Sequence, residues 1–252
     1  MRLIASELLK IRTAPRTVLG LVLAELVIVA LGTASTIDSA TGGGEGLPPG
    51  FDVEVGLPPN LERDLIGVAS SALLFALILG ILVVTWEYRH GTISQTFLAT
   101  PGRERVIGAK AVVAALAGAA LTIPALLLML TIAEIWVGGR EGFHFGGEEL
   151  RLIARLLLAA AIVGVLGLAI GAATGRQLGA VVVSFAWLAF GEHAVGMWSS
   201  VSDYLPGHAI GDMLGVEGDG GKSFLSALLI TGAYVLGLGA LALVVTHRRD
   251  IT

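Results

Sequence analysis

The feature that most constrains this chain is a series of six apolar stretches, each long enough to cross a lipid bilayer as a helix. Such a helix needs about 20 predominantly apolar residues. The stretches occupy residues 17–36, 65–86, 111–137, 150–175, 178–197 and 223–246. Only 14% of the 252 residues are charged, whereas soluble domains carry about 25%. The sequence therefore predicts one all-α transmembrane domain over residues 1–252, with six spans.

Residues 1–16 precede the first apolar stretch and are predicted to form an amphipathic helix in the membrane interface. Apolar side chains recur at helical spacing from Ile4 through Leu8 to Ile11, and polar side chains fill the rest of the circumference. A cleaved signal peptide is the competing interpretation, because positive charge precedes an apolar run. The run is long for a signal peptide and contains Glu25, so we expect residues 17–36 to remain as a span.

Basic residues are distributed unequally between the segments that connect the spans. The N-terminus, residues 87–110, Arg176 and the C-terminus together hold eleven bases and four acids, whereas the remaining connections, counted with the start of the fourth span, hold five bases and thirteen acids. Segments rich in Lys and Arg stay on the cytoplasmic side. We therefore expect both termini and residues 87–110 in the cytoplasm, and the loops 37–64 and 198–222 outside. The predicted location is the cytoplasmic membrane of the cell.

No stretch of the sequence matches a catalytic motif. Residues 215–223 imitate a phosphate-binding loop and end in Gly-Lys-Ser, but the pattern requires glycine where the chain has Val216, and no strand precedes it. Neither HExxH nor Gly-x-Ser-x-Gly occurs, and the chain has no cysteine. We expect no enzymatic site, no bound cofactor, no metal and no nucleic-acid partner.

Two carboxyl groups inside apolar stretches are candidates for a substrate pathway. Glu25 lies near the middle of the first span, and Glu192 lies towards the outer end of the fifth. Ionisable groups within a membrane are costly and usually face the bundle interior or a wet cavity; for Glu192, solvation at the interface is an equal alternative. In the fourth span, the spacing of Gly167, Gly171 and Gly175 favours close contact between helices.

Residues 87–110 concentrate four of the sixteen basic residues between two apolar stretches. The aromatic pair Trp86 and Tyr88 can anchor the preceding span at the interface. Gly91 interrupts the helix, residues 92–99 can form a short helix along the membrane, and Pro101 ends it. The third span then begins within residues 103–110. An ordinary basic loop explains the charge, but not this alternation of helix breakers with an amphipathic turn.

The pattern Glu87-Tyr-x-x-Gly-Thr-Ile-x-x-x-x-Leu98-x-x-Pro-x-Arg103, closing with Lys110, resembles the first cytoplasmic loop of the permease subunits of ABC type-2 transporters. The N-terminal Ser6-Glu-Leu-x-Lys-x-Arg12, the six-helix topology and the Tyr204-Leu-Pro206 connection are also similar to this family. The resemblance covers most of the chain. The long Gly/Pro-rich loop 37–64 departs from it.

The resemblance implies a transmembrane subunit that works with a separate ATPase subunit, present in two copies, which binds the ATP and Mg. It also implies a second permease, identical or related, a surrounding lipid membrane, and a helical hairpin within residues 198–215. The loop would carry the coupling helix that docks on the ATPase. The residues to which this role is carried over are Glu87, Tyr88, Arg89, Gly91, Thr92, Phe97, Pro101 and Arg103.

The expected function is therefore export of an amphipathic substrate, such as a drug, a peptide antibiotic or a lipid, because the spans offer an apolar lining with few charges. One alternative is a membrane sensor or anchor that does not transport. A weaker alternative is an ion-coupled secondary carrier, which would be expected to place more charges at the membrane midplane and to show interrupted spans in matching positions of two halves.

Overall fold

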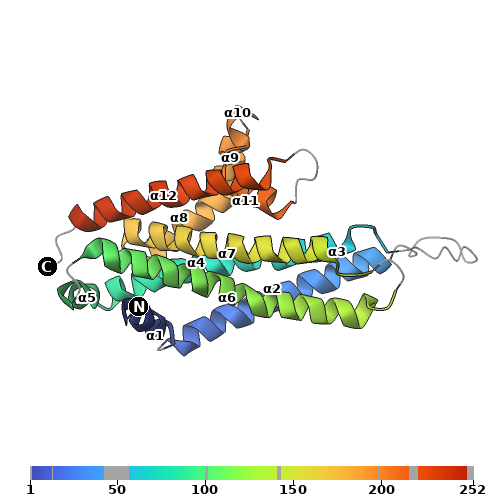
Figure 1. Ribbon diagram of the computed structural model, residues 1–252, viewed down its shortest axis with the longest axis horizontal. Helices are drawn as coiled ribbons and strands as arrows, with labels where there is room; N and C mark the ends of the chain where they lie inside the picture. The colour runs from blue at the N-terminus through green and yellow to red at the C-terminus, as the bar shows by residue number, and fades with distance from the viewer. Residues whose placement is uncertain are drawn as a thin grey trace, which may run out of the picture.

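The computed structural model is a bundle of helices (Figure 1). It describes residues 2–12, 14–42, 57–99, 102–140, 143–197, 199–215 and 221–248. All regular structure in these ranges is helical, and six stretches are long and apolar enough to cross a membrane. The predicted all-α fold with six helices able to cross a membrane is thereby confirmed for the described residues. Pro101, half of the loop 37–64 (residues 43–56) and the middle of residues 215–223 lie outside the described residues.

Each predicted span corresponds to one helical stretch, although the second and fifth are composite. In chain order the helices are α1 (Arg2–Arg12), α2 (Pro15–Thr41), α3 (Leu61–Ala69), α4 (Ala72–Arg89), α5 (Ile93–Ala99), α6 (Arg103–Val137), α7 (Gly147–Thr174), α8 (Gln177–Ala186), a π-helical turn η1 (Trp187–Gly191), α9 (Glu192–Gly196), α10 (Ser199–Ser202), α11 (Pro206–Leu214) and α12 (Phe224–Arg248).

Several helices extend beyond the apolar stretches that predict them. The helix α6 begins at Arg103, whereas the apolar stretch begins at residue 111, and α2 continues to Thr41, whereas its stretch ends at residue 36. Arg, Glu and Lys are good helix formers, so the charged residues 103–110 continue α6 beyond its apolar stretch. Pro124 lies inside α6, which is continuous.

The helices α4 and α7 lie side by side at the centre of the bundle (Figure 1). Their backbones touch, because a Cβ atom on Gly80 would lie 2.0 Å from the carbonyl oxygen of Gly164. Glycine at such a position lets two membrane helices approach until their backbones are in van der Waals contact. The central pair is thus specified by small residues rather than by a stripe of large apolar ones.

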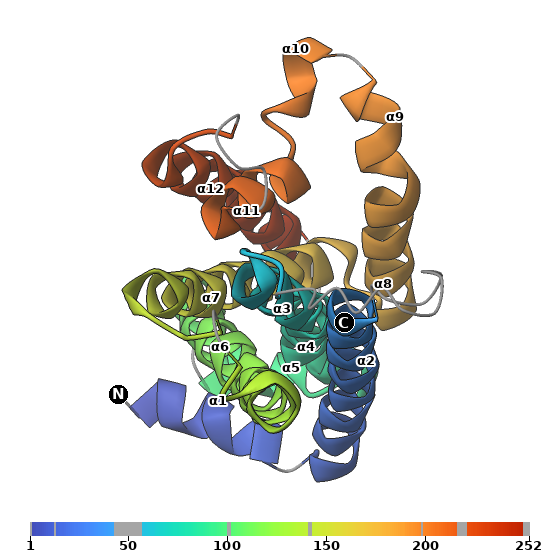
Figure 2. The same cartoon turned by 90° about the vertical axis from the view of Figure 1, so that its right-hand side faces the viewer.

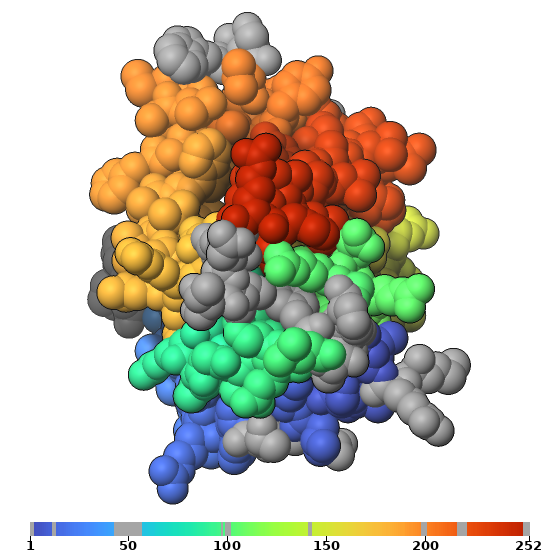
Figure 3. Space-filling model, turned by 90° about the vertical axis from the view of Figure 1, so that its left-hand side faces the viewer, coloured from blue at the N-terminus to red at the C-terminus, as the bar shows by residue number. Residues whose placement is uncertain are grey.

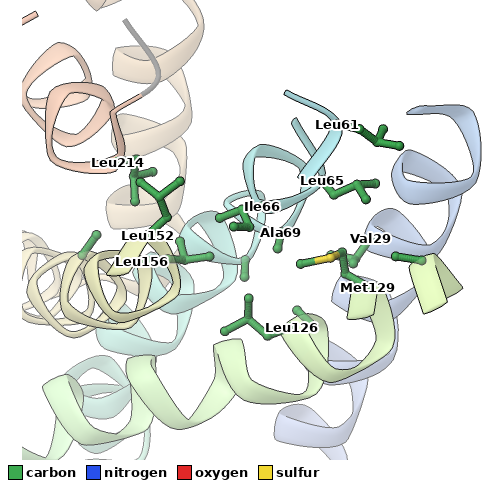
Figure 4. Close-up of a cluster of buried hydrophobic side chains, with 14 of the residues drawn as sticks. Val29, Leu61, Leu65, Ile66, Ala69, Leu126, Met129, Leu152, Leu156 and Leu214 are labelled. Atoms are coloured by element: carbon green, nitrogen blue, oxygen red, sulfur yellow. The ribbon is translucent and has the colours of Figure 1, made fainter. Parts of the chain in front are cut away.

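The largest described cluster of buried apolar side chains lies where α3 meets α2, α6, α7 and α11. Figure 4 shows Val29 of α2, Leu65 of α3, Met129 of α6 and Leu156 of α7 converging there, and all four are fully buried. With Ala72 of α4 and Ala227 of α12, seven helices contribute to this cluster, so this end of the bundle is a packed core and not only a set of apolar spans.

The ribbons of the fifth span, formed by α8, η1 and α9, and of α12 stand apart in Figure 2, whereas Glu192 of α9 contacts Gly207 of α11. Most of its side chains are exposed on the isolated chain. The connection that follows, predicted as a polar outer loop over residues 198–222, contains α10 and α11. Ala209 and Met213 of α11 are fully buried, so this part of the connection packs against the bundle.

The helices α1 and α5 and the C-terminal end of α12 gather at one end of the molecule (Figures 1 and 3). The helix α3 and the C-terminal ends of α2 and α6 lie at the other end. The helix α1 runs across the bundle axis (Figure 2). All the segments predicted to be cytoplasmic therefore share one end; which side of the membrane this end faces, and whether α1 lies in the interface, stay predictions.

Candidate functional site

Residues 87–110 fold as the end of α4, a tight turn, the short helix α5 and the first two turns of α6. The turn requires glycine, because Gly91 has a φ of +67°, a region that side chains with a Cβ atom rarely enter. The N–H of Thr92 donates to the carbonyl oxygen of Glu87 at 3.0 Å and closes the turn. The expected division into helix end, short helix and re-entry is how the chain folds here.

Four charged side chains from three helices meet beneath α5, and we call Glu7, Lys10, Glu87 and Lys110 the four-charge cluster. Lys10 Nζ donates to Glu7 Oε1 at 2.5 Å and to Glu87 Oε1 at 2.6 Å. Lys110 Nζ donates to Glu7 Oε2 and to Glu87 Oε1, both at 2.6 Å. The two acids and two bases of the cluster balance in charge. Their ion pairs join α1, α4 and α6.

The four-charge cluster is largely enclosed by protein. The side chain of Lys110 is 1% exposed and that of Glu7 is 2% exposed, whereas Lys10 is 42% exposed at the rim. A buried charge is tolerated only when it is paired and hydrogen-bonded. Burial alone would lower the pKa of Lys10, but the hydrogen bonds to Glu7 and Glu87 outweigh it and hold this pKa above its ordinary value of 10.5.

The burial of Glu7 changes the expected orientation of α1. The sequence predicts an apolar face that includes Leu8, yet Leu8 and Leu9 are exposed and Glu7 faces the bundle. The reason is that Glu7 supplies both carboxylate oxygens to the two lysines. Leu8 and Leu9 are consequently left on the outer surface of α1, whereas Ile11 packs against the bundle.

The short helix α5 is attached to the four-charge cluster from outside. Thr96 Oγ1 donates to Glu87 Oε2 at 3.2 Å, and Ile93 is buried against the bundle. Leu98 on the same helix is 82% exposed. The helix α5 therefore presents an apolar side chain outwards while its inner face contacts the ion cluster.

Two arginines connect the same segment to other helices. Arg103 Nη1 donates to the carbonyl oxygens of Thr246 at 2.6 Å and His247 at 3.2 Å, which places a cation at the negative C-terminal end of α12. Arg89 Nη1 lies 3.5 Å from Gln177 Oε1 at the start of α8. The segment thus reaches α1, α8 and α12 as well as its own flanking helices.

The other residues assigned to coupling are placed as follows. Tyr88 is half-buried among apolar side chains of α4, α6 and α7, and Gly91 and Thr92 are exposed at the turn. Phe97 lies in α5, but its side chain is not described, and Pro101 is outside the described residues.

The structure brings the two candidate pathway residues to different places. Glu25 lies on the buried face of α2 and is 0% exposed, and neither of its carboxyl oxygens has a hydrogen-bond partner within the described part of the chain. Glu192 lies at the start of α9, where its Oε1 accepts a 2.6 Å hydrogen bond from the backbone N–H of Gly207. It lines a separate cavity between the fifth span and the rest of the bundle.

The three glycines singled out in the fourth span have two different roles. A Cβ atom on Gly167 would lie 2.1 Å from the carbonyl oxygen of Leu77, and one on Gly171 would lie 3.0 Å from that of Ile81. Both positions therefore lie at the contact between α7 and α4. Gly175 has a φ of +66° and ends α7 as its C-cap.

Sequence reasoning did not single out Glu7, Lys10 or Lys110 as site residues. The signals were present, since Glu7 and Lys10 are three residues apart on one helix and Lys110 adjoins an apolar stretch. Their meeting depends on α1 folding back across the bundle, which no local pattern predicts.

A scan against protein-family models finds no match to this chain, and a search of curated proteins finds no relative.

Proposed function

We propose that this chain is the permease subunit of an ATP-driven exporter of the ABC type-2 class, located in the cytoplasmic membrane and working with a separate ATPase subunit. The proposal rests on the resemblance of residues 87–110 to the coupling loop of that class. The observation that carries it is the four-charge cluster beneath α5, because it joins the exposed helix to α1, α4 and α6 through buried ionic contacts.

These contacts offer a route by which a force on α5 could move the spans. A push on α5 reaches Glu87 through Thr96, and Glu87 is bonded to lysines of α1 and α6. Arg103 would pass the same displacement to α12. Buried ion pairs hold a defined geometry, since separating the partners leaves an uncompensated charge. In this proposal the ATPase supplies the push and the helices move as connected bodies.

The exposed Leu98 is the proposed anchor for the ATPase. A large apolar side chain that inserts into a partner's pocket commonly dominates an interface. The neighbouring Gln95 is exposed on the same helix and serves as the matched control.

Purification of the chain from the cells that produce it, followed by mass analysis, tests the proposal. We expect a co-purifying ATPase with Walker motifs. Leu98→Asp should lower its recovery at least tenfold, while Gln95→Asp should leave it within about twofold, because losing one well-packed anchor costs more than 1.4 kcal/mol of binding. Absence of any such ATPase would contradict the proposal, and equal recovery with both variants would remove α5 from the interface.

A further inference from the structure

A cavity of about 530 Å³ lies between the fifth span and the rest of the bundle. Its walls come from α4, α7, α8, η1, α11 and α12, and most of its surface is apolar. This volume lies within the range of about 300–1,000 Å³ that is usual for small-molecule sites. The four-charge cluster contributes none of the residues that line it, so it is a separate site.

Polar groups of the cavity lie at the break between α3 and α4 and at the start of α9, while the hydroxyls of Ser184 and Tyr234, which also line it, donate to the carbonyl oxygens of Ala180 and Tyr204. Ser71 Oγ is buried and has no hydrogen-bond partner in the described part of the chain, whereas the adjacent Ser70 is satisfied by the carbonyl oxygen of Gly67. Glu192 Oε1 accepts a hydrogen bond from Gly207, and no hydrogen bond from the described residues reaches its Oε2. A buried hydroxyl without a partner destabilises the folded chain, so a bound polar group would relieve this cost.

Towards the α5 end of the bundle the lining is apolar. Leu77 lies two turns beyond Ser71 on α4, Ile170 is near the end of α7, and Leu238 is in the second half of α12. Among the described residues that line the cavity, Glu192 is the one charged residue and none is basic. The cavity is therefore polar and acidic towards one end and apolar towards the other.

The wall at Trp187 has an unusual backbone. The turn η1 is π-helical, and a Cβ atom on Gly191 would lie 2.6 Å from the Trp187 ring. Glycine thus leaves room for the indole to lie along its own helix while Trp187 lines the cavity. Single π-helical turns inside α-helices are frequent at functional sites.

We propose that this cavity binds a single-chain amphiphile with a cationic, hydrogen-bond-donating head. The head sits at Glu192 and Ser71, and the alkyl chain extends past Leu77 towards Leu238. Charge complementarity selects the head, because the one charged group among the described lining residues is a carboxyl group. Binding of this kind needs no ATPase; the further statement that the amphiphile is the exported substrate rests on the proposed function.

Trp187 provides a native reporter for the test. A variant with Phe at the other three tryptophans is placed in nanodiscs of unbrominated phosphatidylcholine. Its fluorescence is then titrated with a brominated long-chain alkylamine and, in parallel, with the brominated fatty acid of equal length. We expect saturable quenching by the amine at a concentration at least tenfold lower than by the acid, since a charge-assisted hydrogen bond contributes more than 1.4 kcal/mol.

Two further variants locate the bound molecule. Glu192→Gln should abolish the preference for the amine, and Leu238→Phe should weaken binding of both probes by reducing the cavity. The matched control Leu236→Phe changes a side chain on α12 that is exposed to the surroundings and should bind like the parent. Quenching that never saturates and is identical in all variants means partition into lipid only and overturns the proposal.

Equal affinity for amine and acid would likewise overturn the assignment of a cationic head. The two proposals fail separately. Saturable amine binding without a co-purifying ATPase would leave the cavity assignment intact. Recovery of the ATPase without amine binding would leave the exporter intact and remove this cavity as an amphiphile site.

Discussion

Lys110 is enclosed almost completely by protein, and its ammonium group forms ion pairs with Glu7 of α1 and Glu87 of α4. Lys110→Met would leave Glu7 and Glu87 to share the half-exposed Lys10. Removing one partner from a buried ionic set costs about 3–5 kcal/mol. We therefore predict a decrease of this size in the free energy of unfolding, measured by denaturation in detergent micelles.

The control for this substitution is Lys10→Met, which should cost less because Lys10 is near the surface and exposed pairs contribute little. The double variant Glu7→Met with Lys110→Met removes one acid and one base together. It should be more stable than the sum of the two single variants predicts. Additive losses would show that the four charges do not act as a unit.

Lys10 also predicts how stability depends on pH. Its pKa in the folded chain is raised above 10.5, so the folded state binds this proton more tightly than the unfolded state. The resulting stabilisation is fully present below the ordinary lysine pKa and is lost as pH rises through the raised pKa. Thermal unfolding should therefore show an alkaline loss of stability that Lys10→Met lacks and Lys10→Arg moves to higher pH. An identical alkaline profile for all three proteins would contradict this.

At the residue scale, the sequence indicated which charges were unusual but not which of them meet. Glu25 was expected to be special because of its position inside a span, and it is indeed buried without a hydrogen-bond partner in the described residues. Glu7 was assigned to a polar face because helical periodicity describes only one element. Its burial follows from Lys110, which is 103 positions away in the chain.

At the scale of elements, apolar length predicted the six spans well and their internal breaks poorly. The interruption at Ser70 and Ser71 and the π-helical turn at Trp187 both fall inside stretches with continuous apolar character. Neither break contains proline, the strongest helix breaker, so the sequence pattern does not predict them. Both breaks line the same cavity, which is the context that a linear pattern lacks.

The contact between α4 and α7 gives a prediction for glycine. In Gly167→Ala the new methyl group would collide with the carbonyl oxygen of Leu77, so the two helices must separate, at a cost of about 1–3 kcal/mol for overpacking. Gly237→Ala on α12 has nothing within 4 Å of the new Cβ atom and should be neutral or stabilising, because alanine favours helix. Thermal unfolding of the two variants checks this, and equal stability would contradict the close contact.

At the scale of the whole molecule, the distribution of basic residues predicts that the end of the bundle with both termini and residues 87–110 faces the cytoplasm. The segments richest in bases share one end, with Leu98 on α5, and Arg140 follows α6 at the other end. The sequence has no cysteine, so single cysteines can be introduced on a clean background. Leu98→Cys should resist a membrane-impermeant maleimide in intact cells, and Arg140→Cys should react. The reverse pattern would invert the topology.

The most direct test of the central claim is a crosslink from α5 to an ATPase in native membranes. Leu98→Cys, treated with a short thiol-to-amine crosslinker, should yield a product that contains an ATPase with Walker motifs, and Arg140→Cys should yield none. That result would identify α5 as the surface through which ATP hydrolysis acts on the bundle. Failure of Leu98→Cys to crosslink any ATPase, or an equal yield from both positions, would contradict the account.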